Sequence, residues 1–94
     1  MLSLIPADLS KLSKENLNQE LLRVAIIAEL DAINLYEQLA ALTDNADMKA
    51  VFLDIAKEEK THVGEFQTML LRLDQEQVQE IEHGKEEIKE LTGR

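Results

Sequence analysis

The sequence contains no cysteine and no tryptophan, and it has only one proline, three glycines and three aromatic residues among 94. The absence of cysteine excludes disulfides, thiolate metal ligands and thiol nucleophiles. So little proline and glycine argues against a protein of strands and turns and favours long helices. With few aromatic side chains, a core has to be built mainly from Leu, Ile, Val and Ala.

Basic residues are also scarce, since ten Lys and Arg stand against nineteen Asp and Glu, for a formal net charge of −9. An acidic surface repels nucleic acids and anionic membranes and attracts cations, so we expect no nucleic-acid or membrane partner. No stretch approaches the roughly 18 apolar residues of a membrane-spanning helix. Residues 1–6 lack the basic start and apolar run of a secretory signal, so we expect a cytoplasmic protein.

The spacing of apolar residues predicts one all-α domain over residues 1–94. Residues 1–12 are expected to form an irregular lead-in. Three helices follow, at 13–43, 46–73 and 75–92. The first two helices should form an antiparallel hairpin, to which the third adds a shorter helix.

Polar residues at the predicted helix starts are candidate N-caps, because their side chains can accept hydrogen bonds from free backbone N–H groups. Ser13 or Asn16 would cap the first helix, and Asp44 or Asp47 the second. Asp74 fits the cap position of the third.

Two acidic side chains interrupt the apolar faces of the first two helices. On a helical wheel, Glu29 lies at the centre of the first apolar face and Glu59 on the midline of the second. No Lys or Arg shares these faces. An ionised carboxylate out of water costs several kcal/mol even after relaxation, whereas a whole domain is stable by only ~5–15 kcal/mol. A bound cation would neutralise this charge.

His62 follows Glu59 by three residues and borders the same apolar face. Side chains three apart on a helix are neighbours, so this Glu-x-x-His pair can bind one metal ion. Tyr36 lies two turns past Glu29 on the same face and could donate a hydrogen bond to a ligating carboxylate. Each residue alone also has a purely structural interpretation, as a protonated Glu, a hydrogen-bonded His or an amphipathic core Tyr. Their coincidence favours a metal site.

A second Glu-x-x-His pair, Glu80 and His83, lies in the third predicted helix. Both side chains project away from that helix's apolar stripe, so we expect them on a solvated face. Gly84 follows at once and is expected to interrupt the helix.

One chain therefore offers three ligands, which is half of the six that a four-helix di-iron site uses. Such sites use a Glu from each of two helices and a Glu-x-x-His from each of two others. Two copies related by a two-fold axis would supply the full set and would bury the apolar faces that a lone hairpin leaves exposed. We predict a homodimer that forms a four-helix bundle, with the metal site on its interface.

The segments AELDAINLY (28–36) and EEKTH (58–62) resemble the encapsulated ferritins, half-ferritins that are carried as cargo inside encapsulin shells. The similarity covers about residues 17–73. It implies a ferritin-like bundle with a di-iron ferroxidase centre between two subunits. By position, Glu29, Glu59 and His62 would be the ligands, and Tyr36 would hydrogen-bond nearby. It also implies a ring of dimers, typically a decamer, inside an encapsulin nanocompartment in the cytoplasm.

The predicted function is thus that of a ferroxidase, with Fe(II) and O2 as substrates, which feeds iron storage in an encapsulin shell. Zn, Ca or Mn could replace iron in vitro. Two other functions fit the same residues. A rubrerythrin-like di-iron peroxidase uses similar helices, but such proteins usually carry a Cys-based electron relay that this sequence lacks. A helical oligomerisation module would use its metal only to neutralise buried carboxylates.

Overall fold

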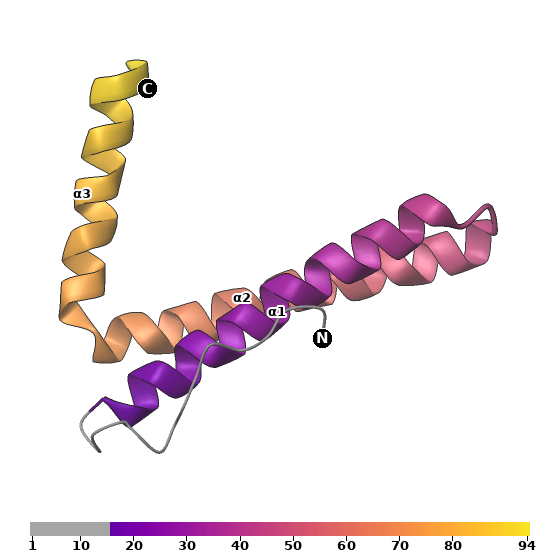
Figure 1. Ribbon diagram of the computed structural model, residues 1–94, viewed down its shortest axis with the longest axis horizontal. Helices are drawn as coiled ribbons and strands as arrows, with labels where there is room; N and C mark the ends of the chain where they lie inside the picture. The colour runs from indigo at the N-terminus through magenta and orange to yellow at the C-terminus, as the bar shows by residue number, and fades with distance from the viewer. Residues whose placement is uncertain (1–15) are drawn as a thin grey trace.

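A computed structural model describes residues 16–94, so the predicted lead-in at 1–12 and the candidate cap Ser13 lie outside the described residues. The described chain forms three helices and no strand: α1 (Leu17–Leu42), α2 (Ala46–Leu73) and α3 (Gln75–Thr92). Helices α1 and α2 run antiparallel, side by side, while α3 leaves the end of this hairpin and points away from it (Figure 1). The all-α prediction, with a hairpin and a shorter third helix, is confirmed.

Asn45 caps α2, because its side-chain oxygen accepts a hydrogen bond of 3.0 Å from the Met48 N–H. The predicted caps Asp44 and Asp47 are therefore wrong. A capping side chain has to stand directly before the first helical residue, a position that Asn45 holds. Asp47 lies inside the first turn, where its charge favourably meets the positive end of the helix dipole.

Asp74 caps α3, as predicted, by accepting a hydrogen bond of 3.0 Å from the Gln77 N–H. The helix continues through Gly84 without a break, so the predicted interruption is wrong. A glycine within a helix weakens it by about 1 kcal/mol relative to alanine but removes no backbone hydrogen bond. The helix ends at Gly93, whose φ of 78° is the left-handed geometry that glycine adopts at helix ends.

The described chain has a thin core. Among residues 16–94, the buried apolar side chains are Ile33, Ala40, Ala56 and Leu70, whereas eleven large apolar residues are exposed. The radius of gyration is 16.7 Å, although a compact domain of this length would have about 12 Å. Two helices can cover each other on one side only, so much of the apolar surface is left uncovered within residues 16–94. No described helix is long and apolar enough to cross a membrane.

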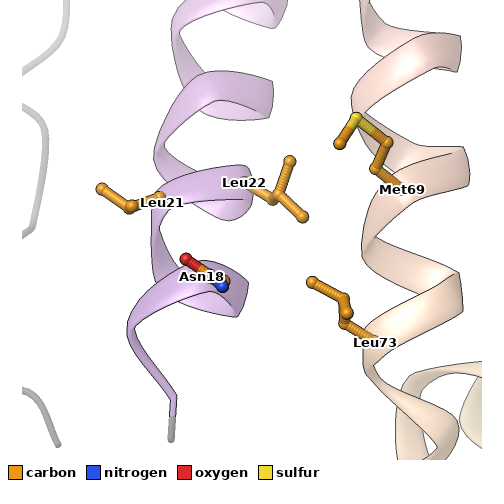
Figure 2. Close-up of a pocket in the computed structure, with 5 residues that line it drawn as sticks. All are labelled: Asn18, Leu21, Leu22, Met69 and Leu73. Atoms are coloured by element: carbon orange, nitrogen blue, oxygen red, sulfur yellow. The ribbon is translucent and has the colours of Figure 1, made fainter. Parts of the chain in front are cut away.

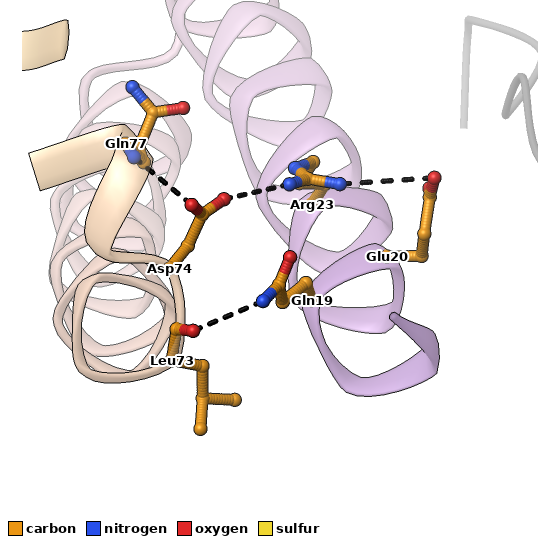
Figure 3. Close-up of polar contacts among 6 residues, drawn as sticks. All are labelled: Gln19, Glu20, Arg23, Leu73, Asp74 and Gln77. Atoms are coloured by element: carbon orange, nitrogen blue, oxygen red, sulfur yellow. Dashed lines mark hydrogen bonds and ion pairs between the residues drawn. The ribbon is translucent and has the colours of Figure 1, made fainter. Parts of the chain in front are cut away.

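A group of polar contacts joins the start of α1 to the turn between α2 and α3 (Figure 3). Arg23 Nη2 donates to Asp74 Oδ2 at 2.8 Å, and Gln19 Nε2 donates to the Leu73 carbonyl at 3.1 Å. The same Asp74 carboxylate caps α3 at Gln77. We refer to these contacts as the polar junction.

Alanine substitutions at two glycines, Gly84 within α3 and Gly93 at its C-terminal end, should change the stability of the protein in opposite directions. A Cβ added at Gly84 would meet nothing within 4 Å, so Gly84→Ala should stabilise the protein by roughly 0.5–1 kcal/mol through helix propensity. Gly93→Ala should instead destabilise it, because alanine is strained at a φ of 78°. Chemical denaturation followed by circular dichroism measures both. Equal shifts of one sign would contradict this account.

The polar junction should weaken in acid. The pKa of Asp74 is lowered, first because the Gln77 N–H donates to the carboxylate and then because Arg23 binds and attracts it, against an opposing effect of partial burial. A group whose pKa is lowered on folding stabilises the fold above its unfolded value, about 3.9 for Asp, and this stabilisation is lost as the pH falls through the folded value.

The matched variant is Asp74→Asn, which keeps a capping oxygen but has no charge. Wild type should be more stable than Asp74→Asn at pH 6, and the difference should shrink below about pH 4. Thermal unfolding at a series of pH values measures it. A difference that stays constant down to pH 2 would rule out the ionised carboxylate as its source.

Candidate metal centre

Three predicted ligands converge between α1 and α2. Glu29 lies in α1, while Glu59 and His62 lie one turn apart in α2. One donor atom from each residue can be chosen so that all three lie within 4.8 Å of one another. The antiparallel hairpin produces this arrangement, because it brings the middle of α1 against the middle of α2.

The imidazole of His62 lies between the two carboxylates. Its Nδ1 is 3.3 Å from Glu59 Oε2 and 3.4 Å from Glu29 Oε2. Because Nδ1 can carry only one proton, it cannot make a full hydrogen bond to each of the two carboxylates. The Glu29 Oε2 atom is buried and accepts no hydrogen bond from the described residues. Within residues 16–94, no Lys or Arg forms an ion pair with Glu29 or Glu59.

Burial separates this cluster from the second Glu-x-x-His pair. The side chains of Glu29 and Glu59 are 21% and 19% exposed, whereas that of Glu80 is 59% exposed. His83 Nδ1 and Glu80 Oε2 approach within 3.2 Å, so the local spacing is the same. Among residues 16–94, only the pair on the hairpin's inner face has a third donor opposite it.

The donor set fits a transition-metal ion. Oxygen and nitrogen ligands about 2.0–2.2 Å from a metal lie at most about 4.4 Å from each other, close to the separation that the cluster already has. Carboxylates with an imidazole suit Fe, Mn and Zn rather than Mg or a thiophilic metal. The buried Glu29 Oε2, which accepts no hydrogen bond from the described residues, is the atom that such an ion would satisfy.

Tyr36 does not join the cluster in the described chain. Its ring lies against Phe52 of α2, with the centroids 6.3 Å apart. No hydrogen bond joins its hydroxyl to any residue of the range 16–94. Its predicted hydrogen bond to a ligating carboxylate stays a prediction for an assembled site.

A hollow between the two helices lies elsewhere, at the end of the hairpin where α1 begins (Figure 2). It holds about 340 Å³ and is lined by Asn18, Leu21, Leu22, Met69 and Leu73. Asn18 is the one polar side chain in this lining, and Leu22 and Met69 each stand two turns from the nearest proposed ligand in sequence. The hollow therefore has no donor set for a metal and is separate from the cluster.

Comparisons with known proteins identify the family of this chain. The sequence profile of the family described as rubrerythrin matches residues 20–92. A crystal structure of the encapsulated ferritin domain from Pyrococcus furiosus superposes with a TM-score of 0.85 at 51% identity, covering 100% of this chain and 98% of that one. The chain belongs to the rubrerythrin family, among the encapsulated ferritins. The resemblance seen in the sequence motifs is thus confirmed.

Two longer relatives extend the comparison. The ferritin-like–encapsulin shell fusion protein of Pyrococcus furiosus is 54% identical over 99% of this chain, which spans 28% of that protein. The encapsulin nanocompartment cargo protein EncC of Myxococcus xanthus is 39% identical over 76% of this chain and 55% of its own length. The chain therefore spans only part of the length of these two relatives.

Metal binding should depend on the inner cluster and not on the outer pair. Glu29→Ala should weaken Co(II) or Zn(II) binding at least about tenfold, because even the outer partners of a metal site contribute that much. Glu80→Ala is the matched control, since it alters an exposed Glu-x-x-His pair. Isothermal titration calorimetry of the full chain measures both affinities. A larger loss in Glu80→Ala than in Glu29→Ala would place the metal on α3 instead.

Proposed function

We propose that this encapsulated ferritin oxidises Fe(II) to Fe(III) with O2 at a di-iron centre that two copies of the chain share. The observation that carries the proposal is the convergence of Glu29, Glu59 and His62 around a buried Glu29 oxygen that accepts no hydrogen bond from the described residues. Three donors leave an ion under-coordinated, and two ions need about twice as many. A second copy would supply the second set, which matches the inventory of ferritin-like di-iron sites.

The exposed apolar surface supports the same pairing. Leu30, one residue after Glu29, and Leu53, two turns before the other ligands, are each about half exposed. Burying apolar surface contributes roughly 25 cal/mol per Å². A two-fold pairing of hairpins would thus cover apolar surface and complete the site in one step. The thin core makes such a partner energetically useful.

Each ligand has a distinct part in the proposed reaction. The carboxylates of Glu29 and Glu59 bind Fe(II) as substrate and hold Fe(III) more tightly, because hard oxygen donors prefer the higher charge. Glu59 is the proposed bridging ligand, since it lies on the midline of its apolar face. His62 contributes a nitrogen donor that favours Fe(II) binding. Two Fe(II) ions would give one electron each, and O2 would take up the two electrons with two protons from water to leave as hydrogen peroxide.

The relatives suggest where the product goes. Two of them are described as an encapsulin shell fusion and as an encapsulin nanocompartment cargo protein. We propose that this chain likewise works inside a cytoplasmic encapsulin shell, as a ring of dimers such as a decamer. A two-helix hairpin encloses no chamber for mineral, so storage would take place in the shell around it.

A peroxidase is the second candidate, because the matching family profile is described as rubrerythrin. The same three ligands would serve it, with hydrogen peroxide in place of O2 as the oxidant. The chain contains no cysteine for an electron relay of its own. Comparing turnover with peroxide against turnover with O2 separates the two, and faster turnover with O2 is expected.

The ferroxidase prediction is tested by Fe(II) oxidation under air, followed by absorbance of Fe(III). Glu29→Ala, Glu59→Ala and His62→Ala should each slow the initial rate at least about tenfold, because a ligand is worth no less than the outer partners of a metal site. His83→Ala is the matched control and should keep the wild-type rate. Four variants as fast as wild type would refute the proposed centre. Metal binding without any oxidation would favour a purely structural metal.

A further inference from the structure

Helix α3 depends on little apolar packing to hold its direction. It leaves the end of the hairpin and has few contacts with α2 beyond the turn (Figure 1). Three of its apolar side chains, Val78, Ile88 and Leu91, are exposed. The hairpin end beneath it is also loosely packed, since Leu21, Met69 and Leu73 around the hollow are each about half exposed.

The polar junction is the well-formed contact at this point (Figure 3). Asp74 is the single residue between α2 and α3, and one of its oxygens accepts from Arg23 of α1 while the other accepts from the Gln77 N–H of α3. Its side chain is only 12% exposed. One carboxylate thus connects the first helix to the third, which otherwise barely touch.

Arg23 is itself held in place. Its Nη1 lies 3.8 Å from Glu20 Oε1 one turn earlier in α1, and its Nη2 faces Asp74. Beside it, Gln19 donates to the Leu73 carbonyl at the end of α2. Two side chains of α1 therefore contact consecutive residues of the turn, which restrains rotation of α3 about that turn.

We propose that the polar junction, with Arg23 and Asp74 at its centre, fixes the angle between α3 and the hairpin, and that this angle selects a single assembly of the chain. The claim about the angle is supported by the contacts described above. The claim about the assembly rests on the ring of dimers in the proposed function. Because α3 is the part that projects from the hairpin, its direction determines where its exposed apolar side chains lie relative to a neighbouring copy.

The angle can be measured by electron spin resonance between two labels. The chain has no cysteine, so Lys57→Cys in α2 and Glu86→Cys in α3 accept spin labels without background. Both positions are exposed. Labelled chain is diluted with unlabelled chain, so that distances within one copy dominate. Native mass spectrometry of the same samples reports the assembly.

Two variants and one control isolate the junction. Arg23→Met keeps a helix-forming stem without charge, and Asp74→Asn keeps the cap without charge. Lys60→Met removes the ion pair between Lys60 and Glu37, whose atoms Nζ and Oε2 are 3.3 Å apart. This pair joins α2 to α1 and does not involve α3. The first two should broaden the distance distribution at least twofold with unchanged helix content and should populate more than one assembly. The control should match wild type in both measurements.

The proposal would be overturned if the label-to-label distance distributions of both junction variants were as narrow as that of the wild type. It would also be overturned if the wild-type distribution were as broad as those of the variants. If Arg23→Met unfolds, Asp74→Asn decides. Broadened distances together with a single assembly in the native mass spectra would overturn only the claim that the angle selects the assembly. Iron is absent from all of these measurements, so a wild-type chain that fails to oxidise Fe(II) would refute the proposed function and leave this test intact.

Discussion

Two carboxylates on the inner face of a two-helix hairpin, with a single imidazole between them, form the interaction that everything else depends on. Glu29 and Glu59 are about four-fifths removed from solvent, and no Lys or Arg pairs with either of them in residues 16–94. Removing charge from water is costly in a chain with so small a core. A metal ion bound between these side chains would offset that cost, because its positive charge attracts both carboxylates.

The same constraint links chemistry to packing. A hairpin with four buried apolar residues in its described part cannot gain much from its own core. Apolar side chains next to the cluster in sequence, such as Leu30, are exposed instead of buried. A second hairpin laid on this face would cover them and would bring three more donors to the cluster. Pairing with a second hairpin would then both complete the ligand set around the desolvated carboxylates and bury the exposed apolar surface.

Helical periodicity was enough to predict the fold class. It also placed Glu29 of one helix and Glu59 and His62 of the other on faces that meet, because the position of a residue on the helical wheel determines whether it faces the partner helix of a hairpin. It also separated two identical Glu-x-x-His spacings, since only one of them borders an apolar face. It could not reveal the ion pair of Arg23 with Asp74, however. These residues lie 51 positions apart, and their contact depends on how the chain turns after Leu73. The same limit explains the wrongly predicted caps of α2, because Asp44, Asn45 and Asp47 are chemically similar and an offset of one or two residues decides which side chain bonds.

The two polar clusters illustrate different uses of charge in one small chain. The inner cluster is acidic and incomplete, with a buried oxygen that accepts no hydrogen bond from the described residues, which suits a site that has to bind something. In the polar junction, by contrast, the carboxylate of Asp74 is matched by a guanidinium and a backbone N–H, which suits a fixed structural joint. Unpaired buried charge destabilises a fold, whereas paired charge at a turn restrains direction without needing a core. We therefore expect a ligand and a partner to bind at the incomplete cluster, whereas the complete one would hold the direction of α3 in the proposed assembly.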